Sequence, residues 1–102
     1  MALENRHFIV IEHSSGTPIQ KAGVNYVYYN HDAAVESIIS TLKDNFEIDD
    51  DGKITKFKVH LPGCNDGITS EDAIRAEMKH SDSLIVDHVA YDIRYDIVEL
   101  IL

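Results

Sequence analysis

The segment that follows residue 46 has the chain's closest approach to the ligand spacing of a metal loop. Counting from Glu47, side-chain oxygens recur at alternate positions, Gly52 stands sixth and Ile54 eighth, as calcium loops require. The twelfth position is Lys58, where calcium needs a bidentate Glu, and a strand pattern follows in place of the exiting helix. We therefore interpret the segment as a solvated turn, in which Asp49 and Gly52 suit tight backbone geometry.

Cys64 is the single cysteine, which excludes an intramolecular disulfide and a multi-cysteine metal cluster. It lies in a loop just before a predicted helix, whose positive end can activate a thiol. Nucleophilic catalysis would also need a histidine held against the thiol. Three histidines are available, although no sequence spacing fixes them there: His60, His80 and His88. An ordinary loop cysteine is the simpler interpretation.

Two further ligand patterns are weak. His60 and Cys64, with Asp66 nearby and two later histidines, offer donor types that zinc accepts, but the spacing is not that of a strong zinc motif. The loop 13–17 follows a strand, as phosphate loops do, yet it holds one glycine and no lysine. We expect neither a metal nor a cofactor.

Acidic side chains dominate the charge of the chain. Asp and Glu number 18 against 9 Lys and Arg, a formal net charge of −9 with His neutral. This sign disfavours nucleic-acid backbones and anionic membranes and favours a basic protein partner, because opposite potentials steer association. The stretch 44–51 has no base among its acids, and a second acidic stretch lies near the C-terminus. The residues we predict to bind a partner are Asp44, Glu47, Asp49, Asp50, Asp51, Asp92 and Asp96.

The first half of the chain predicts two strands and a helix. Residues 8–11 form an aromatic and β-branched run, typical of a strand buried on both faces or nearly so, and residues 24–29 predict a strand that pairs with it. From Asn30 the period becomes helical, with Asn30 or Asp32 as the N-cap. The expected apolar face of this helix comprises Val35, Ile38, Ile39, Leu42 and Phe46.

The second half predicts a strand, a short helix and a long final strand. Residues 57–61 alternate apolar side chains with Lys and His. Thr69 opens a helix that ends near His80. Residues 84–102 fit both the helix and the strand period, and their many Val, Ile and Tyr residues favour a strand, bent or split near 90–92.

These elements predict one α+β domain over residues 1–102. Its order is strand, strand, helix, strand, helix, strand. An antiparallel or mixed sheet with both helices on one face is the simplest way to bury the apolar sides of the helices. No stretch approaches the ~20 apolar residues of a membrane-crossing helix, and the N-terminus lacks a basic segment followed by an apolar one. We therefore expect a cytoplasmic protein.

The favoured function is a small acidic protein-interaction module, such as an inhibitor, an immunity factor or a phage-type antagonist, that binds a basic site on a partner protein. The alternative is a subunit of a homo-oligomer, in which the apolar residues 98–102 complete a neighbour's sheet or pack across a two-fold axis. A small enzyme that uses Cys64 and a histidine ranks third, because the chain shows no established catalytic motif.

Overall fold

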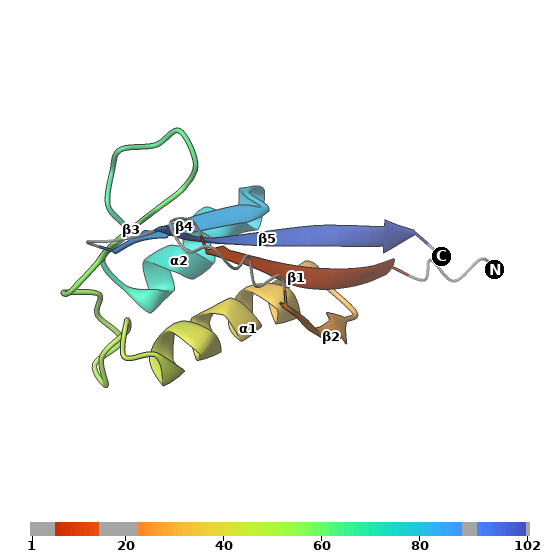
Figure 1. Ribbon diagram of the computed structural model, residues 1–102, viewed down its shortest axis with the longest axis horizontal. Helices are drawn as coiled ribbons and strands as arrows, with labels where there is room; N and C mark the ends of the chain where they lie inside the picture. The colour runs from red at the N-terminus through yellow and green to blue at the C-terminus, as the bar shows by residue number, and fades with distance from the viewer. Residues whose placement is uncertain (1–5, 15–22, 89–91, 102) are drawn as a thin grey trace.

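The computed structural model of the chain describes residues 6–14, 23–88 and 92–101. These residues form a five-stranded antiparallel sheet in the order β2-β1-β5-β4-β3, with two α-helices (Figure 1). In chain order the elements are β1 (Arg6–Ser14), β2 (Gly23–Tyr28), α1 (His31–Asp44), β3 (Lys58–His60), α2 (Glu71–Glu77), the 3-10 turn η1 (Met78–His80), β4 (Ser83–Asp87) and β5 (Asp92–Ile101). The predicted α+β class is confirmed.

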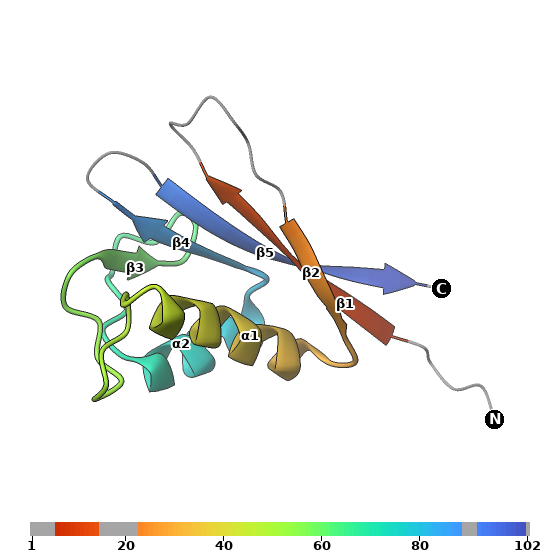
Figure 2. The same ribbon diagram turned by 60° about the horizontal axis from the view of Figure 1, so that its bottom comes forward.

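Both helices cover the same face of the sheet, as predicted, and the core lies between the two layers (Figure 2). On β5 the side chains of Ile93, Tyr95 and Ile97 are buried, whereas the alternate residues Asp92 and Arg94 are exposed. This alternation separates a covered face, which packs against the helices, from an open face on which no described helix lies. The largest buried side chains of α1 and β4 complete the core: Ile38, Ile39, Leu42, Leu84 and Val86.

The start of α1 follows the prediction and its end does not. The N-cap is Asn30, whose Oδ1 accepts a hydrogen bond from the Ala33 N–H at 2.7 Å. The helix stops at Asp44, so Phe46 was wrongly predicted to lie on its apolar face. Phe46 has a positive φ of 60° and its side chain is 77% exposed.

β1 is longer and less buried than the sequence indicated. Phe8 and Val10 pack against the core, while Ile9 and Ile11 alternate with them on the open face and are half-buried. The prediction of a strand buried on both faces was therefore wrong, because helices cover only one face. The predicted pairing with the strand at 24–29 is confirmed, since β1 pairs with β2, and the pairing is antiparallel.

The remaining boundaries shift by a few residues. The strand predicted at 57–61 is β3, only three residues long, and α2 begins from Ser70, whose hydroxyl accepts a hydrogen bond from Ala73 N–H at 3.1 Å. The N-cap is thus one residue after the predicted Thr69. The C-terminal segment consists of two strands, β4 and β5, and its predicted split near 90–92 falls largely outside the described residues.

Arg75 of α2 ties the two helices together. Its guanidinium donates to Glu36 of α1 through Nε at 2.7 Å and Nη2 at 2.9 Å, and to Asp72 through Nη1 at 2.8 Å. The hydrogen bonds from Arg75 hold the pKa of Glu36 below its ordinary value. Because these groups are largely exposed, their contribution is to hold the orientation of the helices more than to add stability.

β1 and β5 together continue beyond the end of β4 on one side of the sheet. β5 pairs with β1 from Ile93 to Ile101 but with β4 only from Asp92 to Asp96. We call the paired segments 6–9 of β1 and 98–101 of β5 the arm. Figure 1 shows the arm extending past both helices, and it contributes to the longest dimension of the molecule, 49 Å.

Candidate interaction surface

The segment that joins α1 to β3 holds most of the predicted acids. We call residues 44–53 the α1 turn. Its backbone closes on itself, since Asp49 N–H donates to Lys53 O at 2.9 Å and Gly52 N–H donates to Asp49 O at 2.9 Å. Gly52 supplies the positive φ of 76° that this closure needs, and its carbonyl accepts the Glu71 N–H at 2.8 Å. The predicted turn is therefore present, and the hydrogen bond from Glu71 N–H to Gly52 O connects it to the start of α2.

The acids of the α1 turn have different roles. Asp49 is structural, because its Oδ1 accepts the backbone N–H groups of Asp51 at 3.0 Å and of Lys53 at 2.9 Å. Asp44, Asp50 and Asp51 are exposed, and none of their carboxylates has an ion pair within the described part of the chain. These three carboxylates are therefore available to a partner molecule.

Glu47 lies inside the molecule. Its side chain is 3% exposed, and its Oε1 lies 3.1 Å from Nε2 of His88, which is 11% exposed. Its Oε2 is buried and finds no hydrogen-bond donor among the described residues. Burial raises the pKa of Glu47, although the neighbouring His88 opposes the rise. This burial argues against the predicted role of Glu47 in binding a partner.

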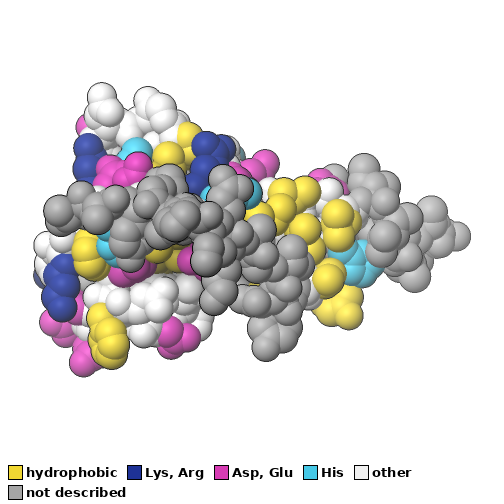
Figure 3. Space-filling model, viewed as in Figure 1, with side chains coloured by type: hydrophobic (Ala, Val, Ile, Leu, Met, Phe, Trp, Pro, Cys, Tyr) yellow, Lys and Arg dark blue, Asp and Glu magenta, His cyan; other side chains and the backbone are white. Residues whose placement is uncertain are grey.

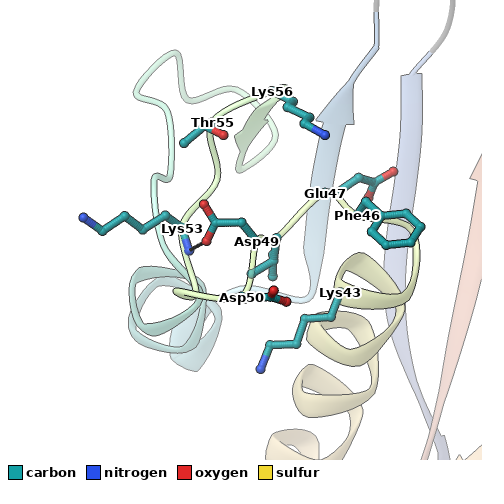
Figure 4. A pocket seen from close by; sticks show the side chains of 9 residues that line it. Lys43, Phe46, Glu47, Asp49, Asp50, Lys53, Thr55 and Lys56 are labelled. Atoms are coloured by element: carbon teal, nitrogen blue, oxygen red, sulfur yellow. Dashed lines mark hydrogen bonds between the residues drawn. The ribbon is translucent and has the colours of Figure 1, made fainter.

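A hollow of about 370 Å³ borders the α1 turn (Figure 4). The Phe46 ring and the Glu47 carboxylate lie on its side toward the strands, and Asp49 lies on the loop side. Three lysines border it as well: Lys43, Lys53 and Lys56. Basic side chains therefore lie among the acids of the α1 turn and beside them, and one of these, Lys43, is already paired with Glu71 at 2.7 Å.

Phe46 occupies an unusual position at the end of α1. Its N–H donates to Lys43 O at 3.1 Å, and the next N–H, of Glu47, donates to Leu42 O at 2.8 Å. This pattern is a Schellman motif, in which glycine normally takes the left-handed residue. Here that residue is a phenylalanine with an exposed ring. Sequence periodicity missed this feature, because no glycine marks the end of the helix.

Asp92 and Asp96 belong to a different surface, the open face. Asp96 accepts hydrogen bonds from Ser83 Oγ at 2.5 Å and Arg94 Nε at 2.9 Å, and it lies 3.3 Å from His13 Nε2. Burial would raise the pKa of Asp96, but the bonds from Ser83 and Arg94 outweigh it and hold the pKa below its ordinary value. Because α1 lies on the covered face, the two groups of predicted acids do not form one surface.

The candidate metal and nucleophile residues do not come together. Cys64 is exposed in its loop, and no hydrogen bond joins it to a histidine within the described ranges. His60 Nε2 lies 3.0 Å from Asp87 Oδ2, and its Nδ1 lies 2.8 Å from Leu61 O. The described part of the chain holds no group of three His, Cys, Asp or Glu residues placed to bind a metal ion. Most of the loop 13–17 lies outside the described residues.

The open face also carries an apolar area that the sequence did not reveal. Val27 of β2 is 50% exposed and Val98 of β5 is 38% exposed, and Ile9 pairs with both across the strands. Figure 3 shows apolar side chains gathered toward the arm. The alternation of apolar and polar residues along the strands predicted two different faces, but it did not indicate which face would lack a helix.

Within the described residues, the helices are too short and too polar to span a bilayer. No protein-family model, curated protein or solved structure matches this chain. We therefore base the proposed function on the geometry of the surfaces described above.

Proposed function

We propose that this chain is a small protein-interaction module whose α1 turn binds a basic surface on a partner protein. The observation that carries the proposal is the exposed ring of Phe46 in left-handed backbone. This conformation costs about 1–2 kcal/mol in a residue with a side chain. In the free protein, a ring that is 77% exposed recovers little of this by burial. A partner that buries the ring would contribute about 1.5–3 kcal/mol.

Three exposed carboxylates of the α1 turn favour a basic partner, and they lie beside a hollow that Lys53 and Lys56 also border. Asp44, Asp50 and Asp51 are exposed and have no ion pair among the described residues. An aromatic anchor surrounded by polar groups is the usual arrangement at the centre of a protein interface. The chain's net charge of −9 would also accelerate the encounter with a basic protein. Inhibitors, immunity factors and antagonists that occupy a basic site act in this way.

The test is affinity capture with matched variants. The immobilised protein is incubated with extract of its source cells, and the bound proteins are quantified by mass spectrometry. Phe46→Ala is compared with Tyr29→Ala, because Tyr29 is equally exposed at 79% but lies far from the α1 turn along the chain. Asp50→Lys with Asp51→Lys is compared with Asp66→Lys and Glu77→Lys, which change exposed acids elsewhere.

We expect at least one basic protein whose retention falls 10-fold or more in the Phe46 and Asp50/Asp51 variants and is unchanged in the controls. Its retention should also fall as salt rises, because exposed charges are screened. The proposal fails if every bound protein is retained equally by the α1-turn variants and their controls.

A second proposed function is self-association through the C-terminal strand. The observation that favours it is that β4 covers the edge of β5 only as far as Asp96. This function does not use the α1 turn.

A further inference from the structure

The segment that follows α1 enters the core at a charged residue. Among the described residues, Glu47 is the only polar residue buried as deeply as the apolar core. It stands between Phe46, which is 77% exposed, and Ile48, which is 3% exposed. Figure 4 shows the Glu47 carboxylate directed toward the strands and away from Asp49. The position of residues 46–48 therefore depends on how a buried carboxylate is accommodated.

His88 is the described base at hydrogen-bond distance from this carboxylate. Its Nε2 lies 3.1 Å from Glu47 Oε1, and its ring packs against that of Phe57 at 4.2 Å between centroids. The other carboxylate oxygen, Oε2, is buried and has no hydrogen-bond donor among the described residues. Glu12 of β1 is negative and repels the carboxylate. Other titratable side chains on the surrounding elements are Lys43 of α1, Lys56 before β3 and Tyr95 of β5.

The pair is neutral only when its two groups share one proton. Whether that proton lies on the Glu47 carboxyl or on the His88 ring, the pair then carries no net charge. Without the proton, a negative carboxylate is buried beside a neutral imidazole, and a buried charge without a compensating one is costly. Repulsion from Glu12 adds to this cost. Because water solvates a carboxylate well, loss of the proton favours movement of Glu47 out of the core.

This segment can open without the rest of the α1 turn. The N–H groups of Glu47 and Ile48 both donate to Leu42 O, at 2.8 and 3.2 Å. The remainder of the turn closes separately, because the Gly52 N–H donates to Asp49 O at 2.9 Å. Local opening of short segments is a normal property of folded proteins, and its frequency can be measured residue by residue.

We propose that Glu47 and His88 form a pH-dependent latch for residues 46–48, which is closed while the pair holds its shared proton and opens more often once the proton is lost. Burial raises the pKa of Glu47, so the closed pair keeps a proton that the separated groups would lose. Above about pH 7, a solvated carboxylate and a neutral histidine hold no such proton. Opening therefore releases one proton, and the open population rises up to about tenfold per pH unit.

Amide hydrogen exchange measured by NMR tests the latch in the free protein. Protection factors compare each amide with the unfolded chain, so the base catalysis of exchange cancels. We expect protection of the amides of residues 47 and 48 to fall 10-fold or more between pH 7 and pH 9. The Gly52 amide, in the same turn but outside the latched segment, should change less than 2-fold.

Two matched variants connect this fall to the carboxylate. Glu47→Gln keeps the shape of the side chain but cannot ionise, so it should remove the pH dependence at residues 47 and 48. Glu77→Gln, which changes an exposed acid on α2, should retain it. Circular dichroism verifies folding. If Glu47→Gln does not fold, the contrast between residues 47–48 and Gly52 in the unmodified protein still decides.

Three results would overturn the latch. The first is equal protection of residues 47 and 48 at the two pH values in the unmodified protein, and the second is the same fall in Glu47→Gln. The third is an equal fall at Gly52, which would mean that the whole turn opens. Because no partner is present in these measurements, their failure is distinct from failure of partner binding at the α1 turn.

Discussion

The buried pair of Glu47 and His88 allows a direct test of how a buried carboxylate and its partner affect the stability of the protein. The Glu47 carboxylate is 3% exposed, with Oε1 3.1 Å from His88 Nε2, and its Oε2 has no hydrogen-bond donor among the described residues. The ring of His88 also lies 4.2 Å from that of Phe57, centroid to centroid. The substitution His88→Phe keeps a ring against Phe57 but removes the imidazole nitrogen that lies beside the Glu47 carboxylate.

We expect His88→Phe to lower the free energy of unfolding by about 3 kcal/mol at pH 8, the lower end of the range for removing one partner of a buried pair. Burial already raises the pKa of Glu47, and His88 opposes this rise, so the substitution raises the pKa further. When folding raises the pKa of a carboxyl group, the folded protein loses stability as the pH rises through the pKa of that group in the folded state.

The pH dependence distinguishes charge from packing. Because burial raises the pKa of Glu47, its carboxyl carries less charge at pH 4 than at pH 8, so the effect of His88→Phe should shrink to about 1 kcal/mol or less at pH 4. Adding Glu47→Gln removes the charge and should restore about 2 kcal/mol at pH 8. Urea unfolding followed by circular dichroism measures the unmodified protein, His88→Phe and the double variant at both pH values. An equal loss at pH 4 and pH 8, with no recovery in the double variant, would refute the electrostatic explanation.

Two further predictions concern backbone geometry and are measured by thermal or urea unfolding. Gly52→Ala should be about 0.5–1 kcal/mol more destabilising than Gly63→Ala: both glycines have positive φ, 76° and 75°, but a Cβ at Gly52 would lie 2.8 Å from Glu71 Oε1, whereas at Gly63 it would meet nothing within 4 Å. Equal losses would mean that the Glu71 side chain moves aside without penalty. Phe46→Asn should stabilise the protein by about 0.5–1 kcal/mol, because Asn tolerates left-handed backbone; a destabilised variant would show that the ring packs on its own chain.

Local signals in the sequence were sufficient for the parts of the fold that depend on local physics. Asn30 was a candidate cap because a short side-chain acceptor can satisfy free N–H groups, and it acts as one. The turn at Gly52 was predicted because glycine adopts a positive φ without steric strain, and Gly52 has a φ of 76°. The end of α1 was missed because Phe46 continues the apolar period, while the hydrogen bond of Glu47 N–H to Leu42 O turns the chain away.

The candidate surface depended on contacts that sequence spacing does not contain. Glu47 looked like one acid among five, but it is buried against His88, which lies 41 residues later. Asp96 likewise interacts with Ser83 and His13, which come from two other strands. Charge patterning therefore identified the acidic α1 turn, and only the three-dimensional arrangement separated its exposed acids from its buried one.

Self-association through the arm would determine where the two α1 turns of a dimer lie. Pairing through the arms would place the two α1 turns at the far ends of the dimer, because the arm and the end of α1 lie at opposite ends of the molecule (Figure 1). Each Phe46 would then remain accessible, and the dimer would present two identical acidic sites that point apart. Such a dimer gains affinity from having two sites only on a partner that repeats its basic surface over a matching distance. Leu100→Lys, which places a charge in the arm, should therefore weaken capture of a repeating partner and leave the binding of a monomeric one unchanged.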